Sequence, residues 1–143
     1  PGEYGGSEIC EFFQNRLDCS THPYFEKIRS LRVSSHFLIE RSGRIVQFVS
    51  TEHCAWHAGV SEYLGRAAVN EFSIGIELEG LDDTTFEDAQ YDALGGLSRV
   101  LIEAYPRLMS ESVVGHSDIA SGRKTDPGPG FDWTRYKQLI TNL

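Results

Sequence analysis

The sequence of 143 residues predicts an α/β domain whose mixed central β-sheet is flanked by helices. Segments with apolar residues at helical spacing are interleaved with a hairpin pattern and with a run that alternates between apolar and other residues. The length fits one domain over residues 1–143. Since the sequence contains no internal repeat, low-complexity segment or linker, we expect the whole chain to form one core.

The helices are predicted from apolar residues that recur at intervals of three and four. Ser7 can cap the first helix, and Pro106 ends the third because proline pushes the residue before it out of helical geometry. Glycines and prolines in residues 122–130 predict a loop before the last helix. The expected helices cover residues 7–17, 24–30, 84 or 85 to 105, and 133–141.

Strands are expected where the apolar period changes to two. Arg41-Ser42-Gly43 lies between two β-rich runs and is a hairpin signal. In the clearest strand the large apolar side chains share one face, and Gly75 and Glu77 share the other. The predicted strands cover residues 33–40, 44–49, 72–79 and 112–115, and residues 55–60 form a short strand or a loop.

Composition and charge exclude several classes of protein. Apolar residues make up 40% and charged residues 24% of the chain, which excludes intrinsic disorder, collagen-like repeats and coiled coil. No apolar run approaches the ~18 residues of a membrane span, so we expect no membrane partner. The net charge of −8 also argues against nucleic acid as a partner, because such binding needs a positive field.

Cysteine usage predicts the compartment. Cys10, Cys19 and Cys54 form an odd set without CxxC spacing, and a core of this size needs no disulfide. We therefore expect reduced thiols in a cytoplasmic protein. Pro1 opens the chain and Met109 is its single methionine, from which we expect an upstream segment in the translated protein.

His116 and Asp126 are candidate metal ligands. His116 follows the strand predicted over 112–115, and Asp126 lies ten residues later in a loop rich in proline and glycine. An imidazole nitrogen and a carboxylate oxygen are ordinary zinc ligands, and a rigid loop can point Asp126 back at the strand end. The alternative is a hydrogen-bonded histidine beside a turn aspartate, and the pair taken alone favours that alternative.

Glu77 and Lys124 are candidate catalytic residues. Glu77 shares a strand face with Gly75, which has no side chain to crowd a ligand. Burial on a strand raises the pKa of a carboxyl group, as a general base near neutrality requires. The Lys124 ammonium group, two residues from Asp126, can stabilise an oxyanion. The alternatives are a solvated strand face for Glu77 and a surface position for Lys124.

The segment Trp56-His57-Ala58-Gly59 suits the wall of a cleft, because an aromatic ring and an imidazole are flanked by small residues. Alternatively, Trp56 belongs to the core. His36 lies within a predicted strand and is expected to be a hydrogen-bonded core histidine. A covalent mechanism is less favoured, since the sequence has no GxSxG motif and no cysteine in a catalytic setting.

Seven blocks of the sequence together resemble the zinc amidases of peptidoglycan, and among them the cytoplasmic 1,6-anhydro-N-acetylmuramyl-L-alanine amidases. The resemblance runs in order through nearly the whole chain. It implies the fold of peptidoglycan-recognition proteins and the phage T7-type lysozyme, a mixed central sheet flanked by helices. The blocks are Pro1-Gly-Glu-Tyr-Gly-Gly6 and residues 31–39, 55–60, 72–80, 88–91, 115–120 and 123–129.

The resemblance implies a role for each candidate residue. His116 and Asp126 match two of the family's three zinc ligands. Glu77 matches the catalytic carboxylate, and Lys124 matches the lysine that stabilises the transition state. The family's first zinc ligand is a histidine at the end of an N-terminal strand, a few residues before the Pro1-Gly-Glu-Tyr-Gly-Gly6 block. We therefore expect residues 1–143 to lack that strand and that histidine, unless His57 substitutes as a ligand.

The resemblance also implies a substrate site. The residues expected to bind an anionic muropeptide are Trp56, His57 and Gly59 in the cleft wall, Arg32 as a fork for a substrate carboxylate, and Arg66 as a local cation. The expected activity is zinc-dependent hydrolysis of the amide between 1,6-anhydro-N-acetylmuramic acid and L-alanine, in cell-wall recycling by a monomer. The rival from another class is a non-catalytic module that binds peptidoglycan fragments on the same fold.

Overall fold

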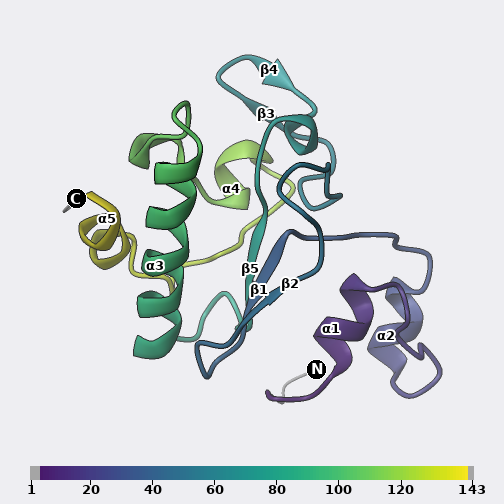
Figure 1. Ribbon diagram of the computed structural model, residues 1–143. Coiled ribbons are helices and arrows are strands. Elements are labelled where there is room, and N and C mark those ends of the chain that lie inside the picture. Colours follow the sequence, from purple (N-terminus) through teal and green to yellow (C-terminus); the bar gives the residue numbers. More distant parts are fainter. Residues whose placement is uncertain (1–3, 142–143) are drawn as a thin grey trace.

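A three-stranded sheet forms the centre of the protein (Figure 1). The computed structural model describes residues 4–141, so Pro1–Glu3 of the predicted N-terminal loop and residues 142–143 lie outside the described part. The strand order is β2 (Ile45–Gln47), β1 (Phe37–Ile39), β5 (Ile76–Leu78). β1 runs antiparallel to β2 and parallel to β5, which confirms the predicted mixed sheet.

Helices flank this sheet on two sides. Figure 1 shows α3 and α5 on one side and the shorter α1 and α2 on the other. A small hairpin of β3 and β4 projects at one end, close to α4. The helices are α1 (Glu8–Phe13), α2 (Pro23–Ile28), α3 (Asp88–Ala104), α4 (His116–Ile119) and α5 (Trp133–Thr141); the hairpin is β3 (Glu62–Tyr63) and β4 (Arg66–Ala67); 3-10 turns cover Val69–Glu71 and Ser110–Ser112.

The predicted hairpin is confirmed. β1 and β2 pair in the register Phe37 to Gln47, and the Glu40 N–H donates to the Arg44 carbonyl 3.0 Å away. Gly43 has φ +82° in the turn, and a Cβ there would lie 2.7 Å from the Ala89 carbonyl oxygen of α3. A glycine is therefore required both by the backbone conformation and by the close approach of the helix.

Two predicted helices begin or end elsewhere. α1 ends at Phe13, well before residue 17, and Asn15 then adopts a left-handed φ of +57°. The Ser7 hydroxyl does not cap this helix but donates to Glu11. The long helix begins at Asp88, later than expected, because the Gln90 side chain accepts a hydrogen bond from the Glu87 N–H and so closes the first turn there.

The strand predicted over residues 112–115 is wrong. A 3-10 turn covers Ser110–Ser112, and Val114 is 37% exposed in a segment that joins no sheet within residues 4–141. Lys137 holds this segment from α5, since its ammonium group donates to the carbonyls of Ser110 and Val113 at 2.9 and 2.7 Å. The predicted strand over 72–79 is shorter as well, with the ladder confined to Ile76–Leu78.

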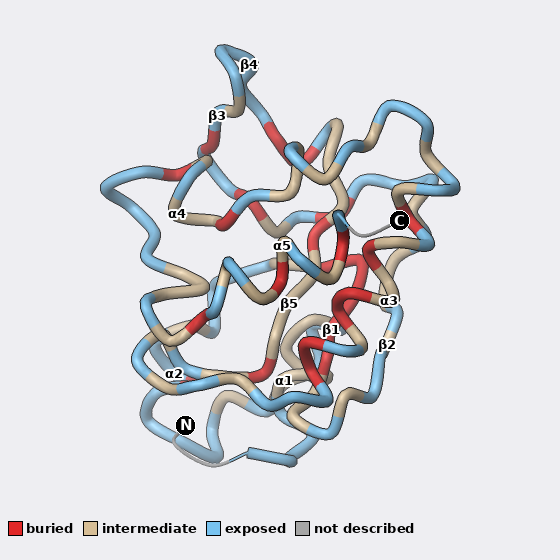
Figure 2. Tube along the Cα trace, turned by 90° about the vertical axis from the view of Figure 1, so that its left-hand side faces the viewer, coloured by how far each residue is buried: buried red, intermediate tan, exposed pale blue. Residues whose placement is uncertain are grey.

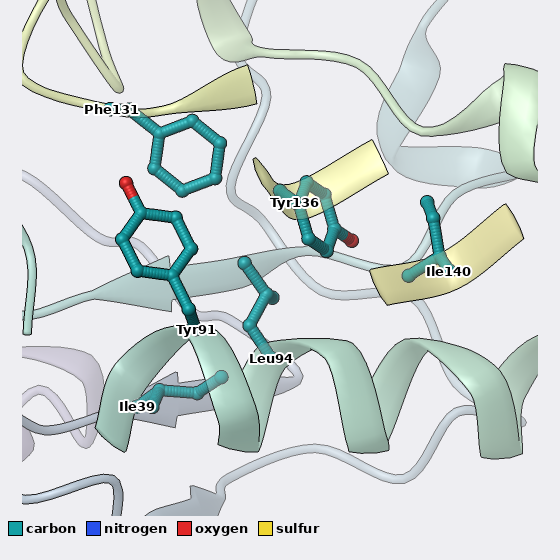
Figure 3. Packing of buried hydrophobic residues seen from close by; sticks show 6 residues of the cluster. All are labelled: Ile39, Tyr91, Leu94, Phe131, Tyr136 and Ile140. Atoms are coloured by element: carbon teal, nitrogen blue, oxygen red, sulfur yellow. The ribbon is translucent and has the colours of Figure 1, made fainter. Parts of the chain in front are cut away.

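The core lies between the sheet and the two longer helices. Figure 2 shows buried residues gathered along β1 and α3. Figure 3 shows the rings of Tyr91 and Phe131 side by side, with centroids 5.3 Å apart, and Ile140 reaching in from α5. The buried cluster comprises Ile39, Tyr91, Leu94, Phe131, Tyr136 and Ile140.

Gln90 joins the helix to the sheet. Its side-chain amide is buried and donates to the Ile39 carbonyl at 3.3 Å and to the Glu79 carbonyl at 3.0 Å. These carbonyls lie at the ends of the two parallel strands. Glu79 is itself buried, and its carboxylate accepts from the backbone N–H groups of Gly5 and Arg41 at 2.7 and 2.9 Å.

The structure bears on membrane-spanning helices and on the cysteines. Within residues 4–141, no helix has both the length and the apolar character that crossing a membrane requires. Cys10, Cys19 and Cys54 are free thiols, as expected.

Candidate active site

His116 and Asp126 meet across the start of α4. The Ser117 N–H donates to the Asp126 carbonyl at 3.0 Å, which ties the loop back to the helix. The Asp118 carboxylate accepts from the Gly115 N–H at 2.7 Å and closes the first turn. As a result, His116 Nδ1 lies 2.9 Å from Asp126 Oδ2.

The other ring nitrogen of His116 is held by the backbone. Its Nε2 donates to the Ala58 carbonyl at 3.1 Å, from a segment 58 residues away in sequence. Metal-binding histidines ordinarily donate one ring N–H to a carbonyl or carboxylate, which leaves the other nitrogen for the ion. His116 Nδ1 and Asp126 Oδ2, 2.9 Å apart, are therefore close enough to be candidate ligands of one ion.

The pair also shifts the pKa values of its members. The hydrogen bond to Asp126 raises the pKa of His116, and the Ala58 carbonyl adds to this effect. Burial acts to raise the pKa of Asp126, but the hydrogen bond from His116 and the positive charges of His116 and Lys124 together outweigh it, so the pKa of Asp126 is lowered. Without a metal ion the two residues thus form an imidazolium–carboxylate pair at moderately acidic pH.

Glu77 lies on β5 opposite Leu38 of β1, and its side chain lines the same cavity as His116 and Asp126. The cavity has a volume of about 1380 Å³. Burial raises the pKa of Glu77 and the nearby Asp126 charge raises it further, while His116 and Lys124 act in the opposite direction. A carboxyl group with a raised pKa holds a proton more readily than an ordinary glutamate, as a residue that takes up and returns a proton requires.

Lys124 completes the charged group at this cavity. It is exposed on the loop between His116 and Asp126, and its backbone N–H donates to the Ala120 carbonyl at 3.0 Å. Its positive charge acts on all three of the other groups, since it lowers the pKa values of Glu77, His116 and Asp126. The structure therefore brings together the four residues that the sequence singled out for metal binding and catalysis.

His57 is the one predicted substrate residue that lines this cavity. Burial lowers its pKa to about 4, and the neighbouring His36 and His116 contribute, so the ring is neutral at physiological pH. The Ser73 hydroxyl, 3.5 Å from His57 Nε2, donates to the Val69 carbonyl at 2.6 Å. A hydroxyl that donates to Val69 can only accept from Nε2, and in the tautomer that makes this bond Nδ1 carries no proton.

The other predicted substrate residues lie elsewhere. Arg32 lines a separate cavity of about 260 Å³, and its guanidinium donates to the Arg29 and Leu31 carbonyls at 3.0 Å. Trp56 is 62% exposed, so the alternative of a core tryptophan is wrong. The Arg66 guanidinium lies over the Phe72 ring, 3.9 Å from its centroid.

Two residues beside the site escaped the sequence analysis. Asn70 is buried, and its side-chain oxygen accepts from the His57 and Ala58 N–H groups at 3.0 and 2.7 Å. The Arg123 guanidinium donates to the carbonyls of Ala58 and Val60. Both residues act on backbone atoms of a loop distant in sequence, and no residue pattern signals such contacts.

The described residues supply two candidate metal ligands. Within residues 4–141, no group of three or more histidine, cysteine, aspartate or glutamate side chains is arranged to hold a metal ion. His57 lines the same cavity, but its side chain does not join His116 and Asp126 in such a group.

Comparison with known proteins gives the family. The family model for N-acetylmuramoyl-L-alanine amidase matches residues 8–129. The chain is 52% identical to the 1,6-anhydro-N-acetylmuramyl-L-alanine amidase AmpD of Escherichia coli (strain K12), over 99% of this chain and 76% of that protein.

Solved structures agree with this result. A crystal structure of a selenomethionine derivative of AmpD matches with a TM-score of 0.95 and 52% identity, over 99% of this chain and 78% of that one. The E. coli amidase AmiD, in complex with anhydro-N-acetylmuramic acid-L-Ala-D-gamma-Glu-L-Lys, matches with a TM-score of 0.70 and 38% identity, over 80% of this chain and 50% of AmiD. The chain therefore belongs to the N-acetylmuramoyl-L-alanine amidase family.

Proposed function

We propose that the chain hydrolyses the amide between 1,6-anhydro-N-acetylmuramic acid and L-alanine in muropeptides. The observation that carries the proposal is the meeting of Glu77, His116, Asp126 and Lys124 at one cavity. Relatives about half identical to this chain are amidases named for that bond. The corresponding role is the recycling of cell-wall fragments by a cytoplasmic monomer, to which the free thiols are suited.

Zinc is the metal that we propose for His116 and Asp126. One nitrogen and one oxygen ligand suit this ion, and the Ala58 carbonyl orients His116 as zinc-binding histidines require. When bound, zinc lowers the pKa of a coordinated water and polarises the carbonyl under attack.

We propose that the third zinc ligand is a histidine on a strand outside residues 4–141, as the family resemblance implies. The cavity beside β5 supports this proposal. Its walls include β5 and residues 113–116, and in the described part of the chain β5 forms a ladder on one edge, with β1. An additional strand on the open edge would pair the β5 backbone groups that this ladder leaves unpaired.

In this proposal Glu77 transfers the proton, and Lys124 stabilises the negative charge that develops during the reaction. Glu77 accepts a proton from the attacking water and returns it to the departing amine of L-alanine, which its raised pKa permits. The Lys124 ammonium group donates to the oxygen of the tetrahedral intermediate, where negative charge develops. The backbone of the loop that carries Lys124 is tied to α4 by two hydrogen bonds, from Ser117 N–H to the Asp126 carbonyl and from Lys124 N–H to the Ala120 carbonyl.

Substrate binding completes the proposal. His57 offers its unprotonated Nδ1 at the cavity, where it can accept a hydrogen bond from a peptide N–H. Trp56 and Gly59 belong to the same loop as His57. Arg32 and Arg66 are proposed as cations that attract the anionic stem peptide. Within residues 4–141, neither side chain lines the large cavity.

The experiment is mass spectrometry of an anhydro-muramyl-tripeptide incubated with the chain, with added zinc or with a chelator. Release of free tripeptide that the chelator abolishes and zinc restores would support the activity. Release that requires an N-terminally extended protein with the family's histidine would support the external third ligand. Binding without release in both proteins would favour the alternative, a non-catalytic module for peptidoglycan fragments.

Glu77→Gln separates catalysis from binding. The variant keeps the side-chain volume but cannot accept the water proton, so we expect loss of hydrolysis with muropeptide affinity retained. Calorimetric titration measures the affinity, and Glu103→Gln on the exposed face of α3 is the matched control. Normal hydrolysis by Glu77→Gln would overturn the assignment of the base.

A further inference from the structure

We infer that Arg123 is a positioning residue for His116, because its guanidinium fixes the carbonyl to which the imidazole is hydrogen-bonded. This inference rests on the proposed function for the meaning of His116 as a ligand. Its geometrical basis is independent of any metal. Arg123 Nη2 lies 2.5 Å from the Ala58 carbonyl oxygen, and His116 Nε2 lies 3.1 Å from the same oxygen.

Arg123 binds the loop of residues 55–60 through two backbone carbonyls. Its Nη2 and Nε donate to the Val60 oxygen at 2.8 and 3.2 Å, in addition to the bond to Ala58. Among the ion pairs of residues 4–141, none includes Arg123, so its charge is directed at backbone oxygens instead. A planar guanidinium can bind two adjacent carbonyls at once, which a single ammonium group cannot do with the same geometry.

Gly59 lies between the two carbonyls, and both its backbone conformation and its lack of a side chain allow this contact. Its φ of +60° turns both oxygens toward Arg123, a conformation that glycine adopts without strain. A Cβ at this position would lie 3.2 Å from Arg123 Nη2, which is tighter than ordinary packing. We therefore assign to Gly59 the role of admitting the guanidinium.

Asn70 holds the opposite side of the same loop. Its side-chain oxygen accepts from the His57 and Ala58 N–H groups, while Arg123 donates to the Ala58 carbonyl. The N–H and the C=O of Ala58 are thus both fixed by side chains, and the residue is fully buried. The carbonyl that orients His116 has little freedom to turn.

The Ala58 carbonyl determines the orientation of His116 Nδ1. If the Ala58 carbonyl moves, the imidazole loses the bond that keeps Nδ1 directed at Asp126. Outer partners of metal ligands typically contribute about 10- to 100-fold to metal affinity. We expect Arg123 to contribute in this range through its hydrogen bond to the Ala58 carbonyl.

The test compares Arg123→Gln, Arg123→Lys and the control Arg16→Gln, which removes the same charge from an exposed site. Two properties are measured in the protein of residues 1–143: backbone hydrogen exchange over residues 55–62 without metal, and zinc affinity by competition with a chelator. We expect Arg123→Gln to speed exchange and to weaken zinc binding about 10- to 100-fold. Arg123→Lys should restore part of both, and Arg16→Gln should change neither.

The two readouts separate this inference from the proposed function. If neither the unchanged protein nor the N-terminally extended protein binds zinc or cleaves muropeptide, the proposed function fails, and the exchange result alone decides on Arg123. Unaltered exchange over 55–62 in Arg123→Gln would overturn the inference. Faster exchange with unaltered zinc affinity would overturn it as well, since the loop would then move without effect on His116.

Discussion

The ring of His57 occupies the space where a side chain on Gly75 would begin. An ideal Cβ on Gly75 would lie 2.4 Å from His57 Cγ, closer than any real contact. The Gly75 N–H also donates to His36 Nδ1 at 3.0 Å, and the rings of His36 and His57 meet edge to face at 5.7 Å. The absence of a side chain two residues before Glu77 thus makes room for an imidazole of the protein, where the sequence suggested room for a ligand.

Gly75→Ala should displace His57 and destabilise the protein. Insertion of a methyl group into a packed site typically costs about 1–3 kcal/mol. Urea denaturation measures the loss, and Gly96→Ala in α3 is the control, because a Cβ there meets nothing within 4 Å and should stabilise the helix. Addition of His57→Ala to Gly75→Ala should recover part of the loss; strictly additive effects would contradict the contact.

Lys124→Met should lower kcat by roughly 10²- to 10³-fold, if the lysine stabilises the oxyanion as proposed. The same change removes a charge that lowers the pKa of Glu77, so the acidic limb of the kcat/KM profile should move to higher pH. Lys27→Met, at an exposed position on α2, removes an equal charge and should leave the rate and the profile unchanged. A profile that stays in place in Lys124→Met would argue against the coupling to Glu77.

Stability of the metal-free protein should depend on pH through His116 and Asp126. The folded pKa of His116 is raised above 6.5, so its contribution is complete below that pH and is lost as the pH rises through the folded pKa. The folded pKa of Asp126 is lowered, so its contribution is present above pH 3.8 and is lost as the pH falls through the folded pKa. The pair therefore stabilises most between these two values.

The size of this effect is limited by solvent. The Asp126 side chain is 43% exposed, so we expect no more than about 1 kcal/mol from the pair. Chemical denaturation in the presence of a chelator, at pH values from 5 to about 9, measures it. In Asp126→Asn the decline above neutral pH should become shallower, and an identical pH dependence in both proteins would contradict the assignment.

Glu79→Gln should destabilise the protein by about 2 kcal/mol, because a carboxamide can present only one oxygen to two backbone donors. Gly5 and Arg41 both donate to the buried carboxylate, and the amide group of glutamine would face one of them. Thermal unfolding measures the loss, with Glu103→Gln as an exposed control. An equal effect of both substitutions would show that the two backbone contacts contribute little.

Local patterns in the sequence predicted the sheet well. The turn at Arg41-Ser42-Gly43 and the strands on either side follow from residue type alone. The error at residues 112–115 has a physical cause. A short β-rich segment needs a partner strand, and within residues 4–141 the carbonyl of Val113 is bonded to Lys137 instead.

Only part of the candidate site could likewise be predicted from the sequence. Glu77, His116, Lys124 and Asp126 were candidates by residue type, each with an ordinary alternative, and the family resemblance gave them their expected roles; the structure brings them to one cavity. Asn70 and Arg123 act through backbone atoms of residues 57–60, and such contacts depend on how distant segments pack. Arg32 was selected for its charge, but the structure directs its guanidinium to carbonyls at the end of α2.

The side chain of Gln90 couples α3 to the sheet. Its buried amide closes the first turn of the helix through Glu87 and also donates to the Ile39 and Glu79 carbonyls, so the helix cannot pivot on the sheet without breaking the last two bonds. A rotation of α3 away from the strand ends would therefore leave the buried amide and both carbonyls without partners at once. Since the Glu79 carbonyl directly follows β5, the same amide also holds in place the strand that carries Glu77.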